Sequence, residues 1–181
     1  MAKRVTKAEW LAAGLQALEQ GGVEAVRIDQ LAKRLRISRS GFYWHFKDRK
    51  DLLGDILQYW KTEFTDVVVR RIGALEGTPE ERLVKLMQMI EQYELNRYEL
   101  PIRAWAHHDP LARDAVATVN KVRMDYVRSL FSEMGFGGDE LEMRTMVFVC
   151  YHTWEKSMFS DMPAAKLAKM RKLRAELLSR K

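Results

Sequence analysis

Helix start and stop signals recur along the whole chain and constrain its fold more than any other feature. The clearest start is Thr78-Pro79-Glu80-Glu81, which combines an N-cap residue, proline at the first helical position and an acid at the third. Asp109-Pro110 is a second start, whereas Gly21-Gly22 and the glycine-rich segment 135–138 are stops. Apolar residues follow the starts at helical spacing, and strand-type alternation is almost absent. The sequence therefore predicts an all-α protein of about nine helices, over residues 7–20, 28–35, 38–46, 48–71, 79–98, a short one from 101, 109–134, 139–159 and 164–179.

The composition is that of an ordinary soluble globular protein. The chain has 181 residues, of which 47% are hydrophobic and 31% charged, and this suffices for one or two domains. Its longest unbroken apolar run, Met146–Tyr151, is too short to span a bilayer, and polar residues interrupt any N-terminal signal segment. The single cysteine, Cys150, cannot form an internal disulfide, and we expect it to be a buried small hydrophobe rather than a redox sensor. These features predict a cytoplasmic protein with no membrane partner.

The net charge of +6 is unevenly distributed along the chain. Residues 1–51 hold 11 Lys and Arg against 6 Asp and Glu, and residues 162–181 hold 7 against 1. Residues 52–161 hold 13 against 18 and are slightly acidic. A basic N-terminal segment favours a polyanion such as DNA, because each neutralised phosphate releases condensed counterions. On the charge distribution alone, a basic surface that is simply solvated is an equally good interpretation.

The segment SRSGFYWHFKDRKDLL, residues 38–53, combines dense aromatic residues with dense cations. On a helix at 100° per residue, Phe42 and Phe46 lie one above the other and face the apolar side chains of the preceding helices. Ser40, Gly41, Trp44 and His45 fall on roughly the opposite side. The segment is therefore predicted to divide into a core face and a surface face.

The surface face has the chemistry of a DNA contact. Arg39 can fork onto guanine, Ser40 can bond several base edges, and Gly41 lets the backbone approach a groove closely. Phosphate contacts are expected from the flanking side chains Tyr43, Trp44, His45, Lys47 and Arg49. The preceding helix, the short turn and the second helix have the dimensions of a helix-turn-helix.

The segment VRIDQLAKRLRISRSGFYWHFKDRKDLL resembles the DNA-binding domain of TetR-family transcriptional regulators. The resemblance rests on Leu31-Ala32, Ile37-Ser38, Tyr43-Trp44-His45-Phe46, Arg49 and Leu52-Leu53, and it covers roughly residues 5–55. It implies that Arg39, Ser40 and Gly41 face bases and that the flanking residues hold phosphates. It also implies an N-terminal three-helix head over residues 1–52 and a ligand-binding and dimerisation bundle over residues 53–181.

Two positions depart from the family pattern. Arg27 stands where the family usually caps the second helix with threonine, and it is expected to contact phosphate without capping. Arg36 stands where the turn usually has glycine, and a left-handed conformation there costs a non-glycine residue about 1 kcal/mol. Both departures add a cation beside the expected path of the phosphate backbone.

The body of the chain is rich in methionine and aromatic residues, which suit an adaptable apolar cavity or, equally, a well-packed core. Resemblance to the family implies a small-molecule effector, with Trp105, His108, Met124 and Trp154 as candidate ligand contacts. The alternative is a body that docks a protein partner and has no small-molecule effector. His107 and His108 point about 100° apart on a helix, so no metal site is expected, and no cofactor is expected either.

The resemblance further implies a homodimer built from the last two helices. The run Met146–Tyr151 is apolar on every side of its helix, so one side needs cover beyond the chain's own core. The resemblance thus implies a DNA-binding transcriptional regulator, a repressor of a pseudopalindromic double-stranded operator, which a small, largely apolar ligand releases. An enzyme is not expected, because no carboxylate pair or nucleophile–base pairing stands out.

Overall fold

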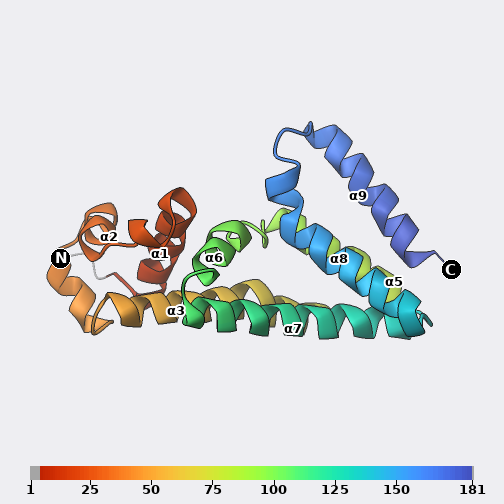
Figure 1. The fold of residues 1–181 in the computed structure, drawn as a ribbon, viewed down its shortest axis with the longest axis horizontal. Coiled ribbons are helices and arrows are strands. Elements are labelled where there is room, and N and C mark those ends of the chain that lie inside the picture. The colour runs from red at the N-terminus through yellow and green to blue at the C-terminus, as the bar shows by residue number, and fades with distance from the viewer. Residues whose placement is uncertain (1–4, 181) are drawn as a thin grey trace. The chain divides into compact units, whose positions relative to one another are not determined.

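A computed structural model of the chain describes residues 5–180, which contain nine α-helices and no strand (Figure 1). The α-helices are α1 (Lys7–Gly21), α2 (Ile28–Leu35), α3 (Arg49–Lys61), α4 (Val67–Gly73), α5 (Pro79–Gln92), α6 (Glu99–Ala106), α7 (Pro110–Glu133), α8 (Gly138–Met158) and α9 (Ala164–Ser179). Two 3₁₀ segments, η1 (Val23–Ala25) and η2 (Arg39–Trp44), and one π-helical segment, η3 (Thr62–Asp66), complete the set. The predicted all-α fold is confirmed. No helix in the described residues is long and apolar enough to cross a membrane.

The predicted helix starts are confirmed by their capping bonds. The Thr78 side chain accepts from the N–H of Glu81 at 3.2 Å, and the Glu81 carboxylate accepts from the N–H of Thr78 at 2.9 Å. The Asp48 carboxylate likewise accepts from the N–H of Asp51 at 2.8 Å and starts α3. These side chains satisfy backbone donors that the first helical turn leaves unpaired.

Two predicted helices have different bounds in the structure. The segment predicted as one helix over residues 48–71 widens into the π-helical η3 before it resumes as α4. The helix predicted over residues 79–98 ends at Gln92, because Glu94 adopts a left-handed φ of 47°. The N–H of Leu95 then bonds the carbonyl of Ile90 at 3.0 Å, and the Leu95 side chain is buried. Burial of an apolar residue just past the helix end is the usual companion of this terminating geometry.

The chain divides into two compact units. The first contains the residues up to Glu63 together with Tyr98–Thr118, and the second contains Phe64–Arg97 with Val119–Lys181. Among the most deeply buried side chains of the first unit are Trp10, Leu31, Phe42, Leu52 and Ile56. The core of the second unit includes Ile72, Leu83, Leu130, Phe131 and Phe148. The functional boundary expected between residues 52 and 53 stays a prediction.

Arg36 ends α2 in the left-handed conformation, with φ 58° and ψ 43°. The N–H of Ile37 bonds the carbonyl of Ala32 at 3.1 Å across this turn, so the conformation is part of the helix end.

We expect Arg36→Gly to stabilise the protein by about 0.5–1 kcal/mol, because glycine adopts this conformation without a steric penalty. Thermal unfolding should show an increase of about 1–4 °C in Tm. The matched control is Lys33→Gly within α2, which should lower stability by about 1 kcal/mol. A lower Tm for Arg36→Gly would contradict the expected strain.

Candidate nucleic-acid interface and candidate ligand cavity

The second helix of the expected helix-turn-helix is the short 3₁₀ segment η2, which two buried rings anchor. Phe42 is fully buried, and its ring lies 5.4 Å from Trp10 in an edge contact and 5.1 Å from Phe46 in a stacked one. Phe46 is also buried and packs edge-on against Trp10. The predicted core face of this segment is confirmed.

The opposite side of η2 presents polar and aromatic side chains to solvent. Arg39, Ser40 and Tyr43 are exposed, and Trp44 is 85% exposed. The Arg39 guanidinium donates to the Tyr43 hydroxyl at 3.3 Å, which links the two side chains along the exposed face. Gly41 is half-buried, and a Cβ there would lie 3.3 Å from the Ile37 side chain, so local packing already favours glycine. The predicted exposed face is confirmed for Ser40 and Trp44, whereas Gly41 and His45, which were expected on the same face, are half-buried.

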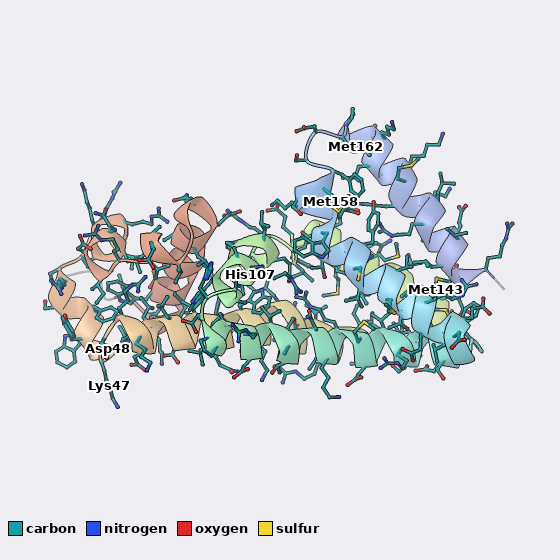
Figure 2. The ribbon with its side chains drawn as sticks, viewed as in Figure 1. Lys47, Asp48, His107, Met143, Met158 and Met162 are labelled. Atoms are coloured by element: carbon teal, nitrogen blue, oxygen red, sulfur yellow. The ribbon has the colours of Figure 1, made fainter. Side chains whose placement is uncertain are left out.

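Exposed Lys and Arg residues flank the η2 segment along the chain. Lys47 is exposed and points away from the ribbon (Figure 2). Arg27 occupies the N-cap position of α2 without a side-chain capping bond, as expected, and lies 3.6 Å from the Asp29 carboxylate. The other exposed cations of this part of the chain are Lys33, Arg34, Arg36 and Lys50.

Two predicted phosphate contacts have partners inside the protein. His45 Nε2 lies 2.9 Å from the Val5 carbonyl, which ties η2 to the start of the chain. Arg49 Nε donates to the Val26 carbonyl at 2.8 Å and Arg49 Nη2 to that of Val23 at 2.6 Å. Arg49 thus holds the segment that leads into α2. The assignment of both residues to phosphates stays a prediction, and sequence reasoning missed their role in the fold.

The second unit contains a cavity of about 60 Å³ that is partly open to solvent. Its walls are mostly apolar. The lining side chains that carry a polar or charged group are those of Thr65, Asn96, Arg123, Tyr126, His152 and Thr153. The lining residues are Phe64, Thr65, Val68, Val69, Leu86, Ile90, Leu95, Asn96, Arg123, Tyr126, Val127, Phe148, Val149, His152 and Thr153.

The four residues predicted as ligand contacts do not line this cavity. Trp105 is buried on α6 and His108 is exposed in the turn after it, both in the first unit. Met124 is half-buried on α7, and Trp154 is 37% exposed on α8. Their role as ligand contacts stays a prediction. A π-helical segment, which supplies two lining residues, has no recognised sequence signal, and this is one reason why the lining was missed.

A larger groove of about 660 Å³ lies between α5, α8 and α9. In its floor, Glu155 of α8 accepts from Arg171 Nε at 2.8 Å and from Arg174 Nη1 at 3.1 Å, both on α9.

His152 is buried beside this cluster. Burial, and then the guanidinium groups of Arg174 and Arg171, hold its pKa well below the ordinary value, so the imidazole is neutral. Asn96 donates to the His152 backbone carbonyl at 3.0 Å.

Helix α8 carries an exposed apolar row, which we call the α8 stripe. Figure 2 shows its residues Met143 and Met158 towards opposite ends of the helix. All of its members are exposed and fall on one side of α8: Met143, Met146, Val147, Cys150, Trp154 and Met158. The expectation that Cys150 is buried is therefore wrong for the single chain, because its position on the helix faces away from the core of its own unit. On α9, Leu173 and Leu177 are also exposed.

Comparison with known proteins matches the N-terminal part of the chain by sequence and nearly the whole chain by fold. The family model for bacterial regulatory proteins of the tetR family matches residues 11–56. The chain is 27% identical over 74 residues to the HTH-type transcriptional regulator AcrR of Shigella flexneri, covering 41% of this chain and 34% of that one. It is 34% identical over 50 residues to the tetracycline repressor protein class G of Vibrio anguillarum, covering 28% and 24%. The matched part thus spans about a third of the first relative and about a quarter of the second.

Solved structures resemble the chain over nearly its whole length. A TetR transcriptional regulator from Legionella pneumophila has a TM-score of 0.77 at 13% identity, covering 98% of this chain and 99% of that one. A transcriptional regulator from Rhodococcus has a TM-score of 0.74 at 15% identity, covering 97% and 94%. At such identities the likeness establishes the fold alone, and the matched head carries the family assignment. The N-terminal part of the chain, residues 11–56, therefore matches the TetR family of bacterial regulatory proteins, and the chain along its length shares the all-helical fold of these solved regulators.

Proposed function

We propose that the protein is a sequence-specific, DNA-binding transcriptional regulator whose η2 segment enters the major groove. The observation that carries the proposal is the two-faced η2, with Phe42 buried in the core and Arg39, Ser40 and Trp44 exposed beside a set of exposed cations. A short helical segment that is anchored through its buried face presents its exposed side chains at a defined position. Readout of base edges requires such a defined position.

Within this proposal the exposed residues divide into two roles. Arg39 and Ser40 read base edges, and the Gly41 backbone approaches the groove floor. Phosphates are bound by Arg27, Tyr43, Trp44, His45, Lys47 and Arg49, with Arg49 also positioning the chain before α2. Trp44 is 85% exposed, and its indole N–H can donate a hydrogen bond to a phosphate oxygen.

A dimer of this chain would cover the α8 stripe and the exposed leucines of α9. A contiguous exposed apolar row on a soluble protein marks an interaction surface, and a twofold axis pairs a surface with itself. Two heads would then contact successive major grooves of a pseudopalindromic operator. Such a dimer acts as a repressor where its operator overlaps the start of transcription.

An effector in the cavity of the second unit completes the proposal. A ligand releases the operator only if it binds the DNA-incompetent conformation more tightly than the DNA-competent one. The alternative, a body that docks a protein partner, needs no cavity, and the mostly apolar cavity of about 60 Å³ therefore favours the small-molecule reading.

The test begins with selection of genomic fragments that the purified protein binds, followed by binding measurements on the selected site. Arg39→Ala should cost about 1–3 kcal/mol at the base pair it reads and relax preference there. Lys47→Ala should weaken all sequences alike and reduce the slope of log affinity against log salt by about one. Failure to enrich any site over random DNA would refute the proposed function, and equal sequence-independent losses from both variants would refute the assigned roles.

A further inference from the structure

We propose that the effector is a small, neutral carbonyl compound with an apolar body, bound in the cavity of the second unit with its carbonyl oxygen at His152 and Thr153. This inference rests on the proposed function and names the ligand class of its regulatory site.

The His152 ring carries its proton on Nδ1. Its Nε2 lies 3.3 Å from Nη2 of Arg174, and a guanidinium can only donate hydrogen bonds, so Nε2 is the acceptor. Burial, and then the nearby guanidinium groups, hold the pKa of His152 well below its ordinary value, so the ring is neutral and has a single proton. Nδ1–H is therefore a hydrogen-bond donor on an uncharged ring.

This donor is available to a ligand in the cavity. Among the described residues no acceptor bonds Nδ1, and Nδ1 is not one of the polar atoms that are sealed from solvent. The two ring nitrogens point in nearly opposite directions, so with Nε2 directed at Arg174 of α9, Nδ1–H points away from α9. His152 is 8% exposed and lines the cavity, to which α9 contributes no residue. Only water or a ligand in the cavity can then complete the donor.

Thr153 adds a second polar group beside it. Its side chain is 7% exposed and lines the cavity but not the groove. The Thr145 hydroxyl, also buried on α8, bonds the Leu141 carbonyl at 2.8 Å. The Thr153 hydroxyl has no such partner in the part of the chain that the structure describes. A carbonyl oxygen has two lone pairs, so His152 and Thr153 can both donate to the same oxygen.

The rest of the wall suits an apolar body. Phe64, Val68, Ile90 and Phe148 line the cavity, and none of these side chains can form a hydrogen bond. The Phe148 ring packs against the His152 ring, with their centroids 4.3 Å apart, and so holds the imidazole in place. A mostly apolar chamber with a few fixed polar groups is the usual form of a small-molecule site.

The charges around the cavity favour a neutral ligand. Arg123 Nε already donates to the Thr65 hydroxyl at 3.1 Å, and Arg123 Nη2 lies 3.5 Å from the Phe64 carbonyl. None of the described lining residues is an aspartate or a glutamate. A charged ligand would give up its hydration for a wall whose cation is already bonded to the protein, which is unfavourable. A carbonyl group loses less on burial, and the positive potential at His152 attracts its oxygen.

The size of the cavity limits the ligand. About 10–15 Å³ of such volume holds one water, so about 60 Å³ holds roughly four to six non-hydrogen atoms. Ile90, Asn96 and His152 line both the cavity and the groove of about 660 Å³, so a longer chain would have to displace these side chains. Butanone fits without that rearrangement and is the probe.

The first measurement compares butanone with butanoate by titration calorimetry on the full chain without DNA. Butanone should bind at least about 10-fold more tightly, because the carboxylate would be buried without a free cation. This comparison needs no variant to fold.

The second measurement isolates the hydrogen bond with 2-methylbut-1-ene, in which a methylene group replaces the carbonyl oxygen of butanone. The preference for butanone over this alkene, compared between proteins, cancels the different hydration of the two probes. It should fall about 3- to 30-fold in His152→Gln, whose amide extends to the position of Nε2 and leaves that of Nδ1 empty. His152→Asn should retain most of the preference, because its amide nitrogen can occupy the position of Nδ1.

His107→Gln is the matched control, since His107 is exposed in the turn after α6 and does not line the cavity (Figure 2). It should leave the preference unchanged. Nitrogen NMR of the protein with isotope-labelled histidine gives a readout other than affinity. The signals that disappear in His152→Gln should be those of a neutral ring with its proton on Nδ1, and butanone should shift the Nδ1 signal.

Tighter binding of butanoate than of butanone would overturn the proposal, as would binding of neither probe. An unchanged preference in a folded His152→Gln, or a His152 ring with its proton on Nε2, would overturn it as well. Operator selection is measured separately. Butanone binding without any DNA selection would refute the proposed function and leave the ligand site standing, and DNA selection without butanone binding would refute the ligand class alone.

Discussion

Phe42→Ala should lower the free energy of unfolding of the first unit by about 3–5 kcal/mol and abolish operator binding at ordinary temperatures. The Phe42 ring is fully buried and contacts the rings of Trp10, Tyr43 and Phe46, so its removal leaves a cavity at the junction of α1 and η2. The same ring holds η2 in place, and a loosened η2 cannot present Arg39 at a defined position. Urea unfolding followed by tryptophan fluorescence measures the first effect, and a gel shift measures the second.

Trp44→Ala is the matched control, because it removes an aromatic ring from the same segment at a side chain that is 85% exposed. Its unfolding free energy should change by no more than about 0.5 kcal/mol, as is usual for exposed positions. Its DNA affinity should nevertheless fall, because Trp44 lies on the proposed contact face. A loss of less than about 1 kcal/mol in Phe42→Ala would show that Phe42 does not anchor η2.

Val147→Glu should convert the proposed dimer into a monomer. Val147 is 42% exposed at the middle of the α8 stripe, and a twofold interface would bring two such glutamates into one apolar contact. Burial of an unpaired carboxylate is strongly unfavourable, so association should be lost at micromolar concentration. Operator affinity should then fall by about 10²- to 10⁴-fold, because the second head no longer binds at a high effective concentration. Sedimentation velocity and fluorescence anisotropy measure the two effects.

Leu75→Glu provides the control for added charge. Leu75 is 41% exposed, nearly the same fraction as Val147, but it lies in the turn after α4 and outside the α8 stripe. This variant should keep both the mass and the operator affinity of the unaltered protein. A dimeric Val147→Glu, or an equally monomeric Leu75→Glu, would place the association surface elsewhere.

The features that sequence reasoning predicted correctly are local. The capping box at Thr78 and the cap at Asp48 involve residues three positions apart, and such bonds depend on residue type and spacing alone. The two faces of η2 follow from the spacing of Phe42 and Phe46, even though the segment is a 3₁₀-helix, because the apolar rings remain on the buried side.

The features that it missed join residues far apart in the chain. Arg49 bonds the Val23 carbonyl 26 residues away, and His45 bonds the Val5 carbonyl 40 residues away. Arg123 meets Thr65 across 58 residues, in a π-helical segment. Each contact pairs a side chain with a group that many other segments also offer, so residue type alone does not identify the partner.

The amino-acid sequence by itself determined the all-helical class, nearly every helix start and the division of the head segment into a buried and an exposed face. Capping, helical periodicity and the restrictions of proline and glycine act within about five residues. They can therefore be predicted from the sequence without knowledge of the tertiary structure. Only the tertiary structure decided which of the cations hold the protein's own backbone, which residues enclose the cavity and that Cys150 lies outside the core of its own unit. These outcomes depend on which helices pack together, and packing selects among many apolar faces that are equivalent in the sequence.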